Sequence, residues 1–292
     1  MKTTIIGLGL IGGSIAIDLR KSGLATSLVG VELNKNNAAK ALELGLVDTI
    51  KPLEDAIAVA DLIITAIPVN SIRTVLLKIL DTTTAGIIID TGSTKSQICK
   101  AVLDHPRRNQ FIAAHPLAGT ENSGPDAAFS GLFSSKTNII CEKEKSSAKA
   151  LEVAEQVFSA LQMRTIFMDP VEHDKHIAYV SHLSHVSAFL LGQTVLDIEK
   201  DEKNIFNLAG SGFASTVRLA KSSPDMWAPI FEQNAEYLSQ ALLEYIMHLQ
   251  KFQYHLMKRD VNELHKIMTK ANHIRDVLAG IELKQPKQLI AK

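Results

Sequence analysis

The chain has 292 residues, enough for two domains with separate cores, and its hydrophobic (46%) and charged (21%) fractions are those of an ordinary globular protein. Its 31 Lys and Arg balance 31 Asp and Glu, which disfavours nucleic acid or a membrane surface as a partner and favours a small molecule. Two cysteines, Cys99 and Cys141, are too few for a disulfide framework and indicate a reducing compartment. The sequence shows no secretory signal pattern and no apolar run of about 20 residues. We therefore expect a cytoplasmic protein.

Short, almost wholly apolar runs alternate with helical stretches through the first half of the chain. Such strands, separated by helices, are typical of βαβ units in a doubly wound, mostly parallel sheet with both faces covered. The predicted strands are 3–6, 28–32, 62–67, 87–90, 111–114, 138–141 and 165–168. The predicted helices are 12–21, 35–44, 71–80, 95–103 and 146–161. We therefore expect an α/β domain of the Rossmann type over residues 1–169.

The pattern changes after Asp169-Pro170, which places the domain boundary near 168–172. The sequence beyond it predicts long amphipathic helices, one over about 176–198 and another over about 261–278. Between them, Ser223-Pro224-Asp225 is a typical helix start, with a capping Ser, Pro at the first position and an acid in the first turn. That helix is predicted to reach the 250s. Residues 170–292 are thus expected to form an all-helical domain for substrate binding and dimerisation.

The last helices carry more apolar side chains than we expect one subunit to cover. These include Leu242, Leu243, Ile246, Leu249 and Phe252. We therefore expect a homodimer formed through the C-terminal helices.

A glycine-rich segment lies between the first predicted strand and the first predicted helix. In its G-x-G-x-x-G spacing, Gly7 allows a tight turn, Gly9 lets the backbone approach a pyrophosphate, and Gly12 lets the helix pack closely on the strand. The free N–H groups at the helix start would hold the pyrophosphate. Alone, the pattern also fits a glycine-rich turn without a cofactor, but the flanking strand and helix favour a dinucleotide site. Further cofactor contacts are expected from Leu10, Ile11, Ile67, Pro68 and Ser93.

The choice of dinucleotide depends on Glu32, which ends the second predicted strand 20 residues after Gly12. An acid at this position accepts hydrogen bonds from the ribose hydroxyls of adenosine and repels a 2′-phosphate. No Arg follows it directly, although Lys35 is close in sequence. The sequence therefore favours NAD over NADP.

Three polar clusters are candidates for chemistry. Residues 90–95 follow one predicted strand and residues 115–121 follow the next, and ligands of open α/β sheets bind beyond the carboxyl ends of strands. The third cluster, at the domain junction, contains His173-Asp174, His176, Ser181-His182 and His185.

His115 is the candidate base. An enzyme that oxidises an alcohol must remove the hydroxyl proton while hydride leaves the carbon, and the ordinary pKa of histidine lies near neutrality. His115 ends a predicted strand just before Pro116, so the backbone would fix its position. A lone histidine is more often structural, but this one is placed where the fold puts chemistry.

The ordered motifs resemble those of prephenate dehydrogenases, a family pattern that also covers arogenate and cyclohexadienyl dehydrogenases. The motifs are the glycine segment, residues 90–95, His115-Pro-Leu-Ala-Gly-Thr-Glu, His173-Asp174, Ser181-His-Leu-Ser-His185, and Arg218 with Trp227. The resemblance extends from Gly7 to Trp227 at least. It implies NAD-dependent oxidative decarboxylation of prephenate to 4-hydroxyphenylpyruvate, a step of tyrosine biosynthesis, by a homodimer.

The resemblance also implies roles for single residues. His115 would bind the substrate hydroxyl and assist its deprotonation, while Ser93 would support that histidine and the nicotinamide end of the cofactor. Arg218 would bind a substrate carboxylate, and His185 would lie at the substrate and bear on substrate choice. The rest of the expected substrate site is Ser181, Trp227 and two acids at its entrance, Asp174 and Glu121. A lone Trp is more often a core or interface residue than a substrate contact.

The sequence departs from the family pattern at Ala214 and Ser215, where many relatives have Arg-Asp. This departure leaves substrate preference and feedback inhibition by tyrosine open. An NADP-dependent arogenate dehydrogenase, a broad-specificity cyclohexadienyl dehydrogenase and a dinucleotide-binding regulator without catalysis remain alternatives. The clustered histidines could form a metal site, but no Cys accompanies them and the implied redox reaction needs no metal, so none is expected.

Overall fold

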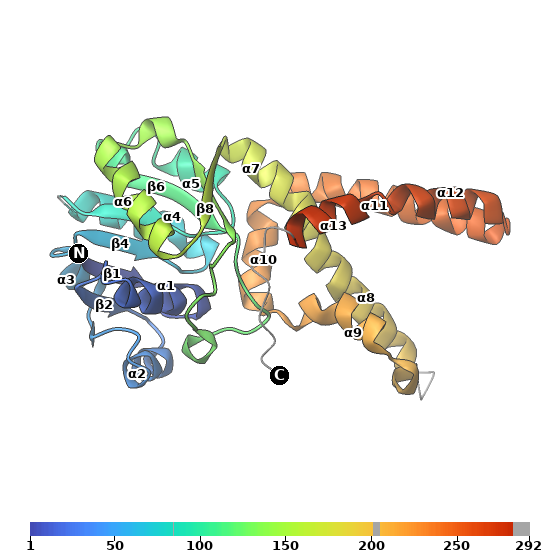
Figure 1. Cartoon of the computed structure of the whole chain (residues 1–292), viewed down its shortest axis with the longest axis horizontal. Coiled ribbons are helices and arrows are strands. Elements are labelled where there is room, and N and C mark those ends of the chain that lie inside the picture. The colour runs from blue at the N-terminus through green and yellow to red at the C-terminus, as the bar shows by residue number, and fades with distance from the viewer. Residues whose placement is uncertain (84, 201–204, 283–292) are drawn as a thin grey trace. The chain divides into compact units, whose positions relative to one another are not determined.

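A computed structural model describes residues 1–83, 85–200 and 205–282 (Figure 1). The chain divides into two compact units, Met1–Ala235 and Glu236–Lys292. The first unit therefore contains both the sheet and the helices that follow it up to residue 235.

The first unit is built on an eight-stranded sheet with the order β3-β2-β1-β4-β5-β6-β7-β8. All neighbouring strands pair in parallel except β6 and β7, so β7 and β8 run against the other six. The predicted doubly wound, mostly parallel sheet is confirmed, together with all seven predicted strands. The short edge strand β3 was not predicted. The bounds are β1 Lys2–Ile6, β2 Ser27–Val31, β3 Thr49–Ile50, β4 Leu62–Thr65, β5 Ile87–Asp90, β6 Phe111–Pro116, β7 Thr137–Cys141 and β8 Arg164–Met168.

Helices cover both faces of this sheet because its central strands are apolar on both sides. Along β4, Ile64 belongs to one buried cluster and Ile63 to the other, as the twofold alternation of a strand requires. Helices α1 Leu10–Lys21, α2 Lys35–Glu43 and α6 Ala148–Ala160 contribute to the first cluster. Helices α3 Leu53–Ile57, α4 Val69–Thr82, α5 Ser96–Ala101 and α10 Pro224–Gln233 contribute to the second. Since α10 follows the Rossmann-type segment by more than 50 residues, its core contacts tie the helical part of the first unit to the sheet.

The predicted helix 176–198 is part of a longer helical run with a wider turn inside it. This run consists of α7 Pro170–Ile177, a π-helical turn over Ala178–His182, and α8 Leu183–Glu199 (Figure 1). Beyond it lie a short 3₁₀ turn Ile205–Leu208, α9 Ser211–Val217 and a second 3₁₀ turn Arg218–Lys221. The predicted helix after Ser223 ends at Gln233, and its continuation into the 250s is a separate helix. Ser223 occupies the N-cap position of α10, but its side chain makes no capping hydrogen bond, so that detail of the prediction was wrong.

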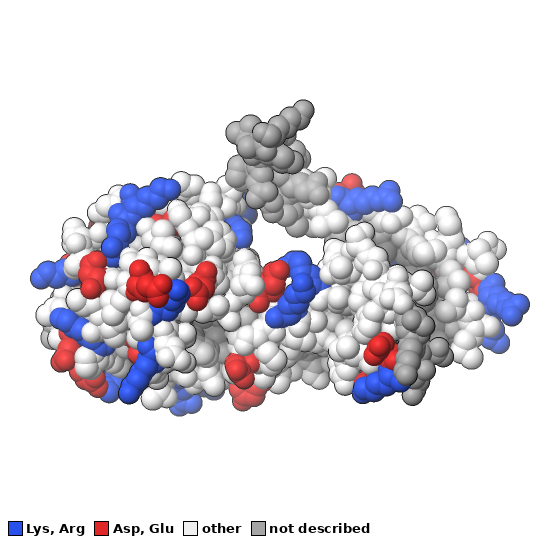
Figure 2. All heavy atoms as spheres, turned by 90° about the horizontal axis from the view of Figure 1, so that it is seen from below, with Lys and Arg blue, Asp and Glu red and all other residues white. Residues whose placement is uncertain are grey.

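Helices α11 Ala235–Met257, α12 Val261–Ala271 and α13 Ile274–Glu282 form the remainder. Asp260 caps α12 by accepting a hydrogen bond from Glu263 N at 3.1 Å, and the predicted helix 261–278 is interrupted between α12 and α13. Many apolar side chains of α11 are exposed, among them Leu243, Ile246, Met247, Leu249 and Leu256. Within the described ranges, every helix is too short or too polar to cross a membrane. Basic and acidic side chains are interspersed on the face shown in Figure 2, in keeping with the balanced composition.

Candidate active site

The glycine loop between β1 and α1 has the shape that its spacing predicts. Gly7 has φ +90°, and a Cβ there would lie 2.4 Å from the carbonyl oxygen of Ala66. A Cβ on Gly12 would lie 1.9 Å from the carbonyl oxygen of Gly7, whereas around Gly9 the nearest atom would be 4.0 Å away. Gly7 and Gly12 are therefore required by the turn and the helix packing, while Gly9 leaves room for a ligand to approach the backbone.

Glu32, just beyond β2, closes the other side of this loop. Its carboxylate accepts hydrogen bonds from Leu8 N at 3.1 Å and Asn34 N at 2.9 Å. Beside it is a pocket of about 500 Å³ lined by Val31, Glu32, Leu33, Ile50, Lys51, Pro52, Leu53, Glu54 and Lys78. This pocket fits the adenosine end of a dinucleotide, since Glu32 lines it and is hydrogen-bonded to Leu8 N of the glycine loop. Lys35, which is close to Glu32 in sequence, does not line this pocket. The cations that line it are Lys51 and Lys78.

The segment after β4 borders the same loop. A Cβ on Gly7 would contact Ile67 Cγ2 at 2.9 Å, and Pro68 is the N-cap residue of α4. Leu10 and Ile11 form the start of α1, where backbone N–H groups are not used by the helix. The structure thus brings all the predicted dinucleotide residues of β1, α1, β2 and β4 to one edge of the sheet.

A chain of hydrogen bonds links His115, at the end of β6, to helix α7. His115 Nδ1 lies 2.9 Å from His173 Nε2, and His173 Nδ1 lies 2.8 Å from Asp174 Oδ1. The Asp174 carboxylate also accepts hydrogen bonds from Lys95 N and Ser96 N, both at 2.8 Å. His115, His173 and Asp174 are 8%, 1% and 2% exposed, so the network lies in the interior. The expectation that Asp174 lies at a site entrance was therefore wrong.

These surroundings favour neutral histidines beside an ionised acid. Burial, followed by repulsion from His173, Lys95 and His182, holds the pKa of His115 well below its usual value. Burial also lowers the pKa of His173, although Asp174 opposes that shift. The pKa of Asp174 is lowered because its hydrogen bonds from His173, Ser96 N and Lys95 N outweigh its burial.

The loop after β5 holds a second buried charge pair. Lys95 Nζ pairs with Asp90, and both side chains are fully buried. Asp90 also accepts a hydrogen bond from Gly92 N at 2.9 Å, and Thr94 Oγ1 donates to Gln233 Oε1 at 2.7 Å. Within this described segment Ser93 is half-buried and makes no hydrogen bond with His115. The partner of His115 is instead His173, which the sequence argument had not paired with it.

The π-helical turn carries a second histidine group. His185 Nδ1 donates to the carbonyl oxygen of Ser181 at 3.1 Å, and its ring stacks on Trp227 with centroids 3.5 Å apart. His182 Nδ1 lies 3.0 Å from Asn234 Nδ2, which fixes that histidine nitrogen as an acceptor. His182 Nε2 and Trp227 Nε1 are buried and have no hydrogen-bond partner among the described residues. They are two donors that a ligand oxygen could satisfy.

Arg218 and Glu121 form an exposed ion pair. Arg218 donates to Glu121 Oε2 at 3.0 Å, and the two side chains are 52% and 27% exposed. A backbone hydrogen bond and the nearby Arg218 lower the pKa of Glu121. Ala214 and Ser215 are exposed on α9, in the turns just before Arg218. The substrate arginine expected from the sequence is therefore at the surface with an acid as its present partner.

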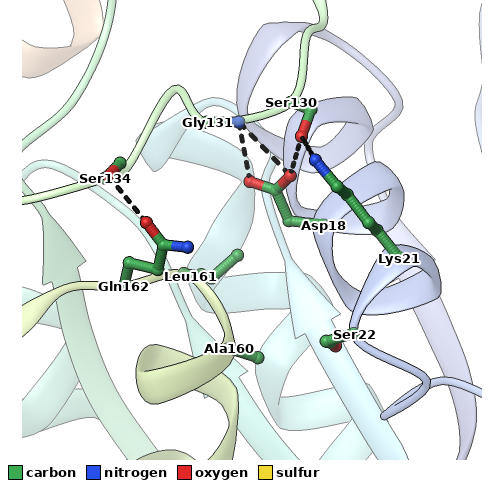
Figure 3. A pocket seen from close by; sticks show the side chains of 9 residues that line it. All are labelled: Asp18, Lys21, Ser22, Ser130, Gly131, Ser134, Ala160, Leu161 and Gln162. Carbon is green, nitrogen blue, oxygen red and sulfur yellow. Dashed lines mark hydrogen bonds between the residues drawn. The ribbon is translucent and has the colours of Figure 1, made fainter.

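A separate hollow of about 340 Å³ lies between α1 and the segment after α6 (Figure 3). Its buried acid, Asp18, already accepts hydrogen bonds from Ser130 Oγ at 2.7 Å and from Gly131 N at 3.1 Å. None of the predicted site residues lines it. We therefore place the candidate site at His115 and not in this hollow.

The glycine loop, the acid beyond β2 and the buried histidine at the end of β6 together define a dinucleotide-binding oxidoreductase. Residues 15–167 match the family model described as prephenate dehydrogenase, nucleotide-binding domain, and residues 169–270 match prephenate dehydrogenase, dimerization domain. The chain belongs to the prephenate dehydrogenase family.

Individual relatives agree with this family. The chain is 30% identical to prephenate dehydrogenase of Bacillus subtilis, over 98% of this chain and 78% of that protein. It is 32% identical to cyclohexadienyl dehydrogenase of Zymomonas mobilis, over 88% of each. A crystal structure of Aquifex aeolicus prephenate dehydrogenase in complex with hydroxyphenyl propionate and NAD⁺ is similar, with a TM-score of 0.86 and 28% identity over 95% of this chain and 98% of that one.

Proposed function

We propose that this enzyme carries out the NAD-dependent oxidative decarboxylation of prephenate to 4-hydroxyphenylpyruvate. The observation that carries the proposal is His115. It is a buried histidine with a depressed pKa at the carboxyl end of β6, a strand parallel to the dinucleotide-binding strands and separated from β4 by β5 alone. A base in this position is neutral at physiological pH and ready to accept a proton.

His115 would act through its Nε2 atom. This atom has no hydrogen-bond partner among the described residues and is not fully enclosed, whereas Nδ1 is engaged by His173. Nε2 accepts the proton of the substrate hydroxyl as that oxygen becomes a carbonyl, and returns it when the oxygen becomes the phenol of the product. The bond to the ring carboxylate breaks, CO₂ leaves, and its electron pair completes the aromatic ring. NAD⁺ supplies the acceptor for the hydride that leaves the ring carbon.

The fit of the chain to NAD rests on the loop and on Glu32. Gly7, Gly9 and Gly12 shape the pyrophosphate site at the start of α1, with Leu10, Ile11, Ile67 and Pro68 around it. Glu32 has lone pairs left for the ribose hydroxyls after its two backbone hydrogen bonds. Ser93 is assigned to the nicotinamide end, beyond β5.

Substrate binding is assigned to the residues of the helical part of the first unit and to Glu121. Arg218 would exchange its bond with Glu121 for one with a substrate carboxylate, the bond for which its planar guanidinium is suited. His185 and Ser181 would border the substrate. Trp227 contributes through the ring face on which His185 stacks and through its unpaired Nε1.

The assembly is proposed to be a homodimer through the last helices, supported by the exposed apolar side chains of α11 and by the family model's description as a dimerization domain.

A cytoplasmic location is supported by Cys99 and Cys141, which are both free thiols.

The deciding experiment compares rates of NADH or NADPH formation with prephenate and with arogenate, each with NAD⁺ and NADP⁺. Prephenate with NAD⁺ is expected to give the highest kcat/KM. A preference for arogenate, or similar rates with both substrates, would instead support the arogenate or cyclohexadienyl alternative, which the Zymomonas mobilis relative favours. Binding of NADH without turnover of either substrate would indicate a dinucleotide-binding regulator.

A further inference from the structure

We propose that His173 and Asp174 hold His115 in the tautomer with the proton on Nδ1, which leaves the Nε2 lone pair available as the base. This inference rests on the proposed function for its catalytic meaning, and it goes beyond it by assigning positioning roles to two residues of α7. The geometry is a continuous path of hydrogen bonds, Asp174 Oδ1 to His173 Nδ1 at 2.8 Å and His173 Nε2 to His115 Nδ1 at 2.9 Å.

The direction of this path is set at its Asp174 end. Asp174 accepts backbone hydrogen bonds from Lys95 N and Ser96 N, so its carboxylate is held ionised and can only accept from His173. The proton between them must therefore lie on His173 Nδ1. A neutral His173 then has its lone pair on Nε2, and this lone pair can only accept a hydrogen bond from His115 Nδ1. His115 is thereby left with Nδ1–H and a basic Nε2.

The alternative direction requires a doubly protonated His173. That ring would donate to Asp174 and to His115 at once, and His115 would carry its proton on Nε2, where it cannot act as a base. Burial and the nearby Lys95 disfavour the charged form of His173, whereas Asp174 and the more distant Asp90 favour it. Burial is the largest of these effects, so the neutral form prevails at neutral pH. The hydrogen bond between His173 and His115 therefore changes direction only at low pH, where His115 can no longer act as the base.

The arrangement extends a principle known from hydrolases, in which a buried carboxylate fixes the tautomer of a catalytic histidine and stabilises its charged form. Here one more imidazole stands between the acid and the base. When His115 takes a proton on Nε2, its Nδ1–H···Nε2 bond to His173 becomes charge-assisted and stronger. This hydrogen bond thus offsets part of the burial and repulsion that lower the pKa of His115.

The first test is made on the wild-type protein. The ¹⁵N chemical shifts of the wild-type protein, labelled at histidine and free of substrate, report which nitrogen of each ring is protonated, and the His115 signals are identified by their loss in His115→Asn. At pH 7.5, His115 and His173 are both expected to carry the proton on Nδ1. A proton on His115 Nε2 would overturn the proposal, whether or not the enzyme turns prephenate over.

The second test uses His173→Leu and Asp174→Asn, with His176→Leu as the matched control, because His176 lies on the same helix but is exposed. Both α7 variants are expected to lower kcat at least about tenfold, but less than His115→Asn, since a positioned acid–base group is worth about 10²–10⁴. NADH affinity should change little, and the His115 tautomer signature should be lost. Unchanged kcat with an unchanged tautomer in a folded His173→Leu variant would overturn the positioning role.

If His115→Asn keeps normal turnover while the wild-type tautomers are as expected, the proposed catalytic role fails and the hydrogen-bonded path stands. The two ideas can therefore fail separately.

Discussion

His115 combines a fixed position with an environment that keeps it uncharged. Replacement by Asn keeps a polar group of similar size at the strand end but removes the basic nitrogen. We expect His115→Asn to lower kcat by roughly 10²–10⁴ while leaving NAD⁺ binding largely intact. Steady-state kinetics and NADH fluorescence titration measure the two effects, and His176→Asn serves as the control. Near-normal turnover of the variant would make His115 a structural residue.

The same residue sets an acid limb in the pH profile. The base works only when unprotonated, and its depressed pKa moves protonation to lower pH, so activity should persist well below pH 6.5 before it falls. The acid limb of the kcat/KM profile reports the pKa of His115 in the free enzyme. The titratable groups that face His115 there are His173, Lys95 and His182. A limb at or above the ordinary histidine value would contradict the burial argument.

Arg218 offers a test of substrate binding separate from chemistry. The ring carboxylate departs as CO₂, and holding it as an anion would oppose its loss. We therefore assign Arg218 to the side-chain carboxylate, which stays unchanged through the reaction. Such an interaction is equal in ground and transition states and affects KM more than kcat. Arg218→Ala is expected to raise KM for prephenate about ten- to hundredfold, the worth of a hydrogen bond to a charged group, with little change for NAD⁺. The expected change is no larger because this arginine is half exposed.

Lys221, on the same 3₁₀ turn, gives a matched cation for comparison. Lys221→Ala should leave KM nearly unchanged. A normal KM with a collapsed kcat in Arg218→Ala would mean that the arginine acts on the reacting centre.

At the scale of elements, the end of β2 determines which dinucleotide fits. The Glu32 carboxylate is tied to Leu8 N beside β1, so a negative charge stands where a 2′-phosphate would have to lie. We expect a clear preference for NAD⁺ in the wild type and a narrower one in Glu32→Ser, because the change removes the repulsion while Lys51 remains in the adjoining pocket. The ratio of kcat/KM for the two cofactors measures this. Equal efficiency in the wild type would refute it.

Elements were predictable where local pattern decides them. The six inner strands are mostly apolar because both faces are covered, and the glycine loop and the strand-end position of His115 follow from the same pattern. Strand β3 has two residues, too few for a periodic signal. The break at Asn234 arises from tertiary contacts: its side chain donates to the carbonyl oxygen of Asp174, 60 residues away, and contacts His182, 52 residues away.

The site was predictable only as separate motifs. His115 and His173 are 58 residues apart, and nothing in their local patterns says that the end of β6 meets helix α7. The adjacent pair His173-Asp174 was visible as a motif. Its place in the interior, however, depends on hydrogen bonds from Lys95 N and Ser96 N to Asp174, and the sequence alone does not reveal these bonds. The packing of the helical part on the sheet is what brings His173 next to His115.

At the scale of the whole molecule, the exposed apolar side chains of α11 predict association. Leu243 and Met247 are 60% and 53% exposed and lie one helical turn apart, so they share a face. Leu243→Lys combined with Met247→Lys is expected to shift the protein from dimer to monomer in sedimentation or light-scattering measurements, because a charge in a closed apolar interface is costly. His248→Lys, an exposed polar site on the same helix but about 140° around its axis from Leu243, is the control. A monomeric wild type would contradict the proposed dimer.

The π-helical turn at Ala178–His182 has a consequence for how this site can evolve. Nine positions separate His173 from His182, which in a regular α-helix, at about 100° per residue, would put them on opposite sides of the axis. A wide turn that absorbs one extra residue reduces that separation to about 80°, so both rings can be buried on the same side. Loss of one residue in this stretch would remove the wide turn but keep His182 and His185 at about the same angle to His173, because eight residues of a regular helix also span about 80°. Loss of one residue elsewhere between His173 and His182 would leave the wide turn in place and rotate the two histidines by about 100°, so we expect deletions among descendants to fall within the turn.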